Sequence, residues 1–429
     1  MTGELEAFTL LIAAAAPCFT QPSFQIFADL VGAWVLCPAR HTVTGLIRVA
    51  DPEGRRAHDA YHRFLRAGAW SAQHLWKILA RQAVGTLYAG AAVVCLDVDD
   101  TLFHKTGRKV EGAGNFRDAI ASTRQRVVYA LGLNLVVLTL RVTPPWGGEP
   151  LGLPINLRLF RKGGPTHNEL ARSMVEEVAG WFPHLSFVLC GDGAFASLAA
   201  GGLPRTQVVS RMRRNAALFE AAPPRTGRRG RPRKRGERLP SLASLAASAT
   251  WQEVTLELRG KKLTRLVYSR PVLWYRMWPD AMVMAVIVRD PAGVQPDDYL
   301  FTTDLSVTPS WVAECYAGRW SIEDTFRSTK QFLHGEDPQC WKGQGPERAA
   351  GLSFWIYSTV WLWYITTQGT KTTWPSLPWY PAKCTPSFID ALAALRRVLW
   401  HHRIFATSTP GRLSPKIAEA VVETLARAA

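Results

Sequence analysis

AAVVCLDVDD, residues 91–100, is a compact apolar run that ends in three acidic residues. Its length and composition are typical of a buried strand, and VVYALGLNLVVLTLRV, residues 127–142, predicts paired strands after it. A later apolar run, LSFVLC, predicts a further strand that delivers Asp192 within CGDG. Strands that carry acids at their C-terminal ends predict an α/β core with a carboxylate cluster at one edge of the sheet.

A helix is expected between these strands. THNELARSMVEEVAGWF, residues 166–182, opens with Thr166 and Glu169 in the spacing of a capping box and stops before Pro183. Its apolar positions recur at helical spacing, which indicates an amphipathic helix that covers one face of the sheet. Strands joined through such a helix support the α/β class.

The regions on either side of this core differ from it in composition. Residues 1–90 have apolar positions at helical spacing, and Thr42 is placed to cap a short helix beside Arg40, His41 and Arg48. We interpret this region as a DNA-binding helical domain; packed helices with incidental arginines are the alternative. The expected domains are 1–90, helical; 91–203, first part of the α/β core; 204–298, a basic and β-rich insert; 299–345, second part of the core, with the helix that carries Glu323; and 346–429, helical.

Charge points to a polyanionic partner. The 429 residues include 51 Lys and Arg against 34 Asp and Glu, a formal charge of +17. Nucleic acid is the first candidate, and a basic enzyme whose charge only aids solubility is the alternative.

The seven cysteines form no CxxC pair, which favours reduced thiols in the cytosol. Residues 349–366 approach the length of a membrane span, but we interpret them as a core helix and expect no membrane association.

Much of the positive charge lies in residues 204–238, which hold twelve Lys or Arg against Glu220 and Glu237. The centre of this segment, RRGRPRKRG at residues 228–236, contains an Arg-Gly-Arg-Pro element of the kind that lies in a narrow minor groove. A solvated basic loop is the alternative. Alternating runs after it predict antiparallel strands. The residues of this segment expected to contact DNA are Arg229, Arg231, Arg233, Lys234 and Arg235.

The most specific motif is YAGRWSIEDTFRSTKQF, residues 316–332. Thr308 and Pro309 are a natural N-cap and first helical position, so a helix is expected to begin there and to run through the motif. At about 100° per residue, Tyr316, Arg319, Glu323 and Lys330 fall on one face, with Arg327 close to it. Such a face can hold a phosphodiester beside a metal-binding carboxylate; an exposed helix with Arg–Glu pairs would look the same.

The spacing of Tyr316, Arg319, Glu323 and Lys330 resembles the YREK signature of a branch of bacterial insertion-sequence transposases. The resemblance is sharp over residues 91–200 and 300–335. It implies an RNase H-like fold with an inserted β region, and it assigns the carboxylates Asp99, Asp192 and Glu323 to catalysis and to binding two Mg²⁺ or Mn²⁺ ions. Asp97 and Asp100 compete with Asp99 as the first of these acids.

The resemblance also implies a reaction and a set of partners. The chain would hydrolyse DNA at element ends to free 3′-hydroxyls and join them to target DNA, so the partners are double-stranded terminal inverted repeats and target DNA. The implied setting is the bacterial cytoplasm, at the nucleoid, as a homodimer on DNA. Tyr316, Arg319, Arg327, Lys330 and Lys105 are expected to contact the DNA backbone. No Trp of this chain could be matched to the base-flipping role that some members of the branch use for hairpin formation.

A rival interpretation begins from the same acids. CLDVDDTLF also looks like the first motif of haloacid dehalogenase-like phosphatases, with Asp97 as the phosphoryl acceptor and Asp99 as the general acid and base. Thr139, Lys162 and Asp192 would then supply its later motifs. This interpretation leaves the basic insert and the motif around Glu323 unexplained. A third hypothesis is a DNA-binding relative without catalytic activity.

Overall fold

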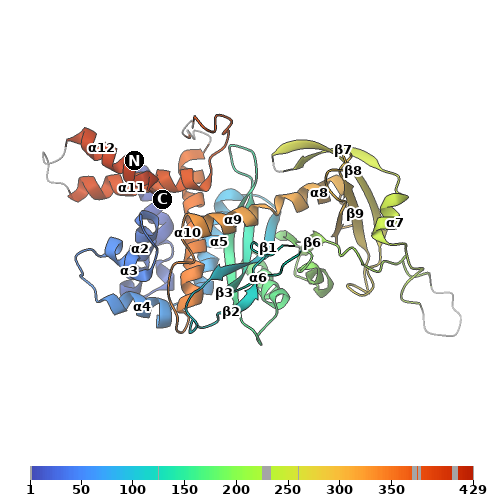
Figure 1. Ribbon diagram of the computed structural model, residues 1–429, viewed down its shortest axis with the longest axis horizontal. Helices are drawn as coiled ribbons and strands as arrows, with labels where there is room; N and C mark the ends of the chain where they lie inside the picture. The colour runs from blue at the N-terminus through green and yellow to red at the C-terminus, as the bar shows by residue number, and fades with distance from the viewer. Residues whose placement is uncertain are drawn as a thin grey trace.

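The computed structural model of the chain describes residues 2–123, 125–224, 233–258, 260–369, 374, 378–407 and 414–428. The molecule is elongated, with helices at one end, a sheet in the middle and the strands of the insert at the other end (Figure 1). Arg229 and Arg231 of the basic segment lie outside the described residues.

One mixed sheet organises the fold. Its strands are β1 (Val93–His104), β2 (Gly114–Arg117), β3 (Tyr129–Val142), β4 (Leu151–Phe160), β5 (Ser186–Gly191), β6 (Thr206–Arg211), β7 (Gln252–Leu258), β8 (Lys261–Val272), β9 (Val283–Arg289) and β10 (Asp298–Thr302). Their order is β2-β3-β1-β5-β6-β10-β9-β8-β7, with β4 paired to β3. Strand β1 is antiparallel to β3 and parallel to β5, and β6 is parallel to β5. The α/β class predicted from the sequence is confirmed.

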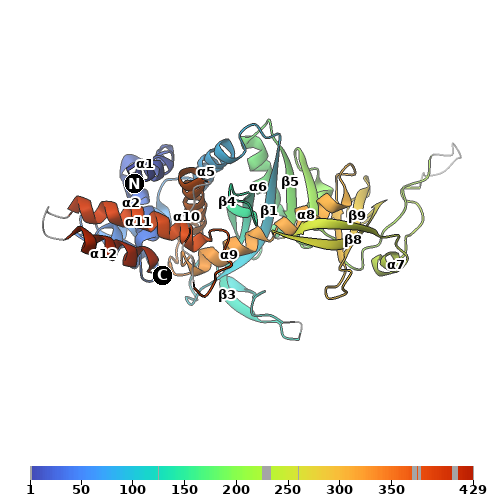
Figure 2. The same cartoon turned by 90° about the horizontal axis from the view of Figure 1, so that it is seen from above.

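The helices flank this sheet and extend beyond it. They are α1 (Thr2–Ala13), α2 (Gln21–Leu36), α3 (Val43–Ala50), α4 (His58–Ala67), α5 (Ala72–Leu87), α6 (His167–Trp181), α7 (Leu242–Ala247), α8 (Pro309–Gly318), α9 (Ser321–Gln331), α10 (Gly345–Gln368), α11 (Phe388–Thr407) and α12 (Pro415–Arg427). Figure 2 shows α9 and α8 following one another along the sheet, from α10 toward β8 and β9.

Local sequence signals explain several of these boundaries. The Thr166 side chain accepts a hydrogen bond from the Glu169 amide, and the Glu169 carboxylate accepts one from the Thr166 amide, so the predicted capping box is present. Thr42 caps α3 through a single hydrogen bond, which its side chain accepts from the Gly45 amide. Buried residues occupy both faces of β3 from Gly132 onward, because helices cover both sides of the sheet there.

The strands of the insert join the central sheet. β7, β8 and β9 are antiparallel, as the alternating runs predict, and β10 pairs with both β9 and β6. β10 thus carries the hydrogen-bond ladder from the core into these strands, and all of them belong to one sheet. The insert and the core present one continuous surface beside α8.

The long apolar segment near residue 350 is a core helix. Trp355, Trp361 and Trp363 of α10 are all nearly inaccessible to solvent, and α10 packs against β4, α4 and α11. Across the part of the chain that is described, no helix has both the length and the apolar character to cross a membrane. The interpretation of this segment as a buried helix agrees with its packing.

Candidate functional site

Asp99 lies in β1, and Asp192 directly follows the neighbouring strand β5. The parallel register pairs Val98 of β1 with Gly191 of β5, so the two acids are the next residues along each strand. Adjacent strands lie about 4.8 Å apart, which brings the two carboxyl groups into one electrostatic environment. Burial raises the pKa of Asp99 to about 7, and the charges of Asp192 and Asp100 add to the rise while Arg319 opposes it. The Asp99 side chain still keeps 18% of its surface exposed.

The neighbouring acids of β1 have other partners. Asp97 is fully buried and forms an ion pair with Arg141, and Ser321 donates a hydrogen bond to the same carboxylate. Asp100 points to the opposite face of the sheet, where it accepts a hydrogen bond from Asn134 at 2.9 Å. Of the three candidates for the first carboxylate, Asp99 is the one that faces α9 from a partly exposed position.

The burial of Asp97 also bears on the phosphatase hypothesis. A phosphoryl acceptor must reach its substrate, whereas Asp97 has no exposed surface and is held by the Arg141 guanidinium, with Arg141 Nε 3.1 Å from its carboxylate. Asp97 is therefore a structural ion pair beneath the site. This observation removes the group on which the phosphatase hypothesis depends.

The motif around Glu323 is carried by two helices instead of one. Thr308 caps α8 and Pro309 is its first residue, as predicted. The helix then tightens: the amides of Arg319, Trp320, Ile322 and Glu323 each bond to the carbonyl three residues before them. Helix α9 starts again at Ser321. The expectation of a single continuous helix is corrected, because this tight turn re-aims Arg319 toward the sheet.

Arg319 links two of the predicted acids. Its Nη1 lies 2.7 Å from Asp99 Oδ2, and its Nη2 lies 2.9 Å from Glu323 Oε1. Its guanidinium carbon is 5.6 Å from the centre of the Tyr316 ring. The site therefore gathers Asp99, Glu323, Arg319 and Tyr316, with Asp192 beside Asp99.

The three carboxylates are near one another but do not form a closed metal cage. In the described part of the chain, ligand atoms of three acids or histidines come within 4.8 Å of one another in a different cluster, and Asp99, Asp192 and Glu323 do not meet that distance. The guanidinium of Arg319 stands between Asp99 and Glu323. A cation thus already neutralises the two acids that a divalent ion would join.

A cavity of about 650 Å³ opens beside these residues. Tyr316, Arg319 and Glu323 form one wall, and β6 and β8 supply cations to the other. These cations are Arg211, Lys261 and Arg265, of which Arg211 pairs with Asp298 and Arg265 with Asp290 in the lining of the same cavity. They are not among the DNA contacts predicted from the sequence, although Lys261, Leu263 and Arg265 alternate with the period of a strand and so share one face. The insert therefore contributes directly to the site.

The other described cations that were predicted to contact DNA do not line this cavity. Lys105 is 6% exposed, and its ammonium donates to the carbonyls of Glu336 and Pro338, so it serves the packing of a loop. Lys330 is half-buried, with its Nζ 5.8 Å from the centre of the Phe103 ring. Arg327 is exposed and paired with Asp324. The exposed cations Arg233, Lys234 and Arg235 border the part of the basic segment that is not described.

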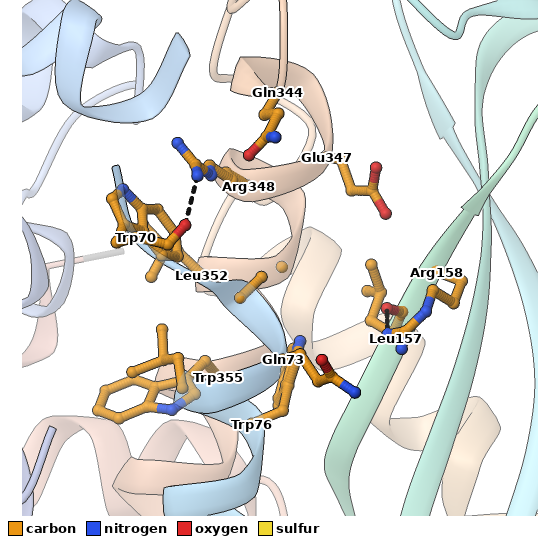
Figure 3. A pocket seen from close by; sticks show the side chains of 13 residues that line it. Trp70, Gln73, Trp76, Leu157, Arg158, Gln344, Glu347, Arg348, Leu352 and Trp355 are labelled. Atoms are coloured by element: carbon orange, nitrogen blue, oxygen red, sulfur yellow. Dashed lines mark hydrogen bonds between the residues drawn. The ribbon is translucent and has the colours of Figure 1, made fainter. Parts of the chain in front are cut away.

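A smaller pocket of about 240 Å³ lies elsewhere, between α5, β4 and α10 (Figure 3). Trp70, Trp76 and Trp355 line it, and Arg348 donates a hydrogen bond to the Trp70 carbonyl at 2.5 Å. Glu347 at its rim is paired with Arg161. The volume is below the range of about 300–1,000 Å³ that is typical of ligand pockets, and none of the predicted acids lies there.

The raised pKa of Asp99 predicts a dependence of stability on pH. In the folded protein the Asp99 carboxyl keeps its proton up to about pH 7, whereas an ordinary aspartate loses it near pH 3.8. The stability that this group contributes is therefore present at low pH and is lost as the pH rises toward 7. In metal-free buffer, Asp99→Asn should therefore melt higher than the natural protein at pH 8, with a smaller difference at pH 5. Thermal unfolding in EDTA at both pH values measures this. An equal difference at both would contradict the assignment.

The site thus combines two neighbouring aspartates, a glutamate joined to one of them through an arginine, and a cavity lined by both cations and acids. Carboxylates in such a place are suitable ligands for a divalent metal that assists phosphodiester cleavage. Residues 16–277 match the model of the family described as DDE superfamily endonuclease, and the chain belongs to this family. The match includes Asp99 and Asp192 and ends before Glu323. A comparison with curated proteins found no match. Family membership supports a nuclease that acts on DNA, and nucleases of this superfamily generally use divalent metal ions.

Proposed function

We propose that the chain is a DNA transposase that cleaves the ends of its element and joins the freed 3′-hydroxyls to target DNA. Asp99, Asp192 and Glu323 are the catalytic and metal-binding acids in this proposal. The observation that carries it is the contact of Arg319 with both Asp99 and Glu323, which are 224 positions apart (323 minus 99). Asp192 directly follows β5, the strand next to that of Asp99. The mixed sheet would be an RNase H-like core, and α8 and α9 would carry the YREK motif.

The donor set suits the proposed ions. Mg²⁺ and Mn²⁺ prefer oxygen ligands, and the carboxylates of Asp99, Asp192 and Glu323 would provide them once Arg319 no longer stands between Asp99 and Glu323. When bound, two such ions would activate the attacking water or 3′-hydroxyl and stabilise the departing oxygen. Arg319 forms ion pairs with both Asp99 and Glu323, which indicates that a positive charge is favoured between these two carboxylates.

The chain's own side chains would position the DNA backbone. Once Arg319 releases a carboxylate, its guanidinium can hold a phosphate through two parallel hydrogen bonds. Tyr316, which lies between Arg319 and Arg211, is placed to donate its hydroxyl to the same backbone. Lys261 on the opposite wall would hold the strand as it leaves the site.

The wider features of the proposal follow from charge and from the chemistry of transposition. The net charge of +17 and the basic segment that includes Arg233, Lys234 and Arg235 favour binding along duplex DNA. Two element ends require two active sites, so we propose a homodimer assembled on the terminal inverted repeats. The corresponding location is the bacterial cytoplasm, at the nucleoid.

Nicking of supercoiled plasmid tests the nuclease part of this proposal. In Mn²⁺ the natural protein should convert plasmid to the nicked form, and Glu323→Gln should not. Asp324→Asn is the matched control, because Asp324 is the adjacent acid and pairs on the surface with Arg327. Equal nicking by the natural protein and Glu323→Gln would remove Glu323 from the site.

A further inference from the structure

A second cluster of potential ligands lies away from the proposed catalytic acids. His41, in the loop between α2 and α3, meets His334 and Asp337, in the loop after α9. One ligand atom from each of the three residues lies within 4.8 Å of the other two. Neither the family match nor the proposed transposase chemistry gives this cluster a role.

One nitrogen of His41 is a lone-pair donor inside the protein. His41 is 1% exposed, and its Nε2 lies 2.9 Å from the carbonyl oxygen of Trp34. Because a carbonyl only accepts, Nε2 must carry the hydrogen and Nδ1 must carry the lone pair. Nδ1 is buried and has no hydrogen-bond partner. A histidine whose second nitrogen donates to a backbone carbonyl has the arrangement that metal-bound histidines usually show.

The other two residues are held in place around His41. His334 has a φ of 47°, a left-handed backbone that residues other than glycine adopt infrequently. This backbone stacks its ring on that of His41, with the ring centres 4.8 Å apart. Asp337 Oδ2 accepts a hydrogen bond from the His41 amide at 3.0 Å and lies 3.9 Å from His334 Nδ1. Arg40 approaches the other oxygen, Oδ1, at 4.0 Å, which leaves Oδ2 on the histidine side.

We propose that His41, His334 and Asp337 bind a divalent transition metal ion, with zinc as the best fit. Two imidazoles and one carboxylate are ligands that zinc accepts, and water can complete a tetrahedral set. Mg²⁺ prefers an all-oxygen set, so this site differs in metal preference from the acids around Asp99. The ion joins the N-terminal helices to the loop that follows α9, and in this way it fixes the end of the helix that carries Glu323.

Zinc binding by the full chain tests this proposal. The protein is stripped with a chelator and titrated with Zn²⁺ against a chromophoric competitor, in an Asp99→Asn/Glu323→Gln background that lacks two of the proposed catalytic acids. One zinc per chain is expected. Adding His334→Asn should weaken binding by about 100-fold or more, because even loss of an outer hydrogen-bond partner costs roughly 10- to 100-fold. Asparagine is a suitable replacement because it tolerates the left-handed backbone.

His104→Asn is the matched control, since His104 lies between the carboxylates of Asp118 and Glu336 and outside the cluster. It should bind zinc like its parent. Absorption of the Co²⁺-substituted chain provides a second readout that needs no variant: a tetrahedral spectrum supports the site. Failure to retain zinc, or equal affinity in His334→Asn, would overturn the proposal. Zinc binding in a chain that does not nick DNA would instead count against the proposed transposase alone.

Discussion

Asp99→Asn is expected to abolish metal-dependent DNA cleavage, whereas Asp100→Asn is expected to leave it within a few-fold of the natural rate. Asp99 lies beside Asp192 and contacts Arg319, while Asp100 faces the other side of the sheet and bonds to Asn134. A bound metal stabilises the transition state by several kcal/mol, and each ~1.4 kcal/mol changes the rate by a factor of ten. The cleavage rate of Asp99→Asn is therefore expected to fall by about 10³-fold or more.

The cleavage rate of a labelled duplex in Mn²⁺ measures this difference. Each variant removes one carboxylate, and the two positions are adjacent in β1. The variants therefore differ mainly in which face of the sheet loses its carboxylate. Thermal unfolding confirms that each variant is folded. Loss of cleavage in Asp100→Asn with activity retained in Asp99→Asn would place the first acid at Asp100 and refute the assignment.

Asp97→Ala is expected to destabilise the fold by about 3–5 kcal/mol, because removing one partner of a buried ion pair leaves the other charge uncompensated. Asp97 is fully buried, and the Arg141 guanidinium that it holds also donates to the carbonyl of Cys315 in α8. The pair therefore fixes α8 against the sheet beneath the proposed site. Urea-induced unfolding of the purified variant gives the free-energy change.

A double variant separates the effect of the lost charge from the effect of lost packing. Asp97→Ala combined with Arg141→Met removes both charges and should recover a large part of the stability lost in the single variant. An Asp97→Ala protein with unchanged stability and no activity would instead indicate a direct chemical role for Asp97, as the phosphatase hypothesis requires. A folded but weakened protein that still cleaves DNA supports the structural role.

The elements that carry the acids could be predicted because their signals are local. The apolar run before Asp97, the capping box at Thr166 and the Thr308–Pro309 pair each fix a strand or a helix start within a few residues. The choice among the acids of β1 also has a local component, since alternate residues of a strand face opposite sides. Which side faces α9 depends on the tertiary fold.

Other features depend on contacts between distant residues. The turn at Arg319 and Trp320 interrupts a segment whose helical period is otherwise regular, so spacing alone predicts one helix. Lys105 reads as an exposed cation in sequence, yet two carbonyls from a loop more than 200 residues later enclose it. The meeting of His41 with His334 joins two loops that share no sequence pattern. Such arrangements follow from the three-dimensional packing of whole elements.

The most direct test of the transposase proposal uses a labelled duplex that carries the terminal repeat of the element that encodes the chain, together with unlabelled target DNA and Mg²⁺. The natural protein should cut at the repeat boundary and transfer the labelled 3′-end to the target, while Glu323→Gln should bind the repeat and form neither product. Cleavage that ignores the repeat boundary, or strand transfer that persists in Glu323→Gln, would contradict the proposal.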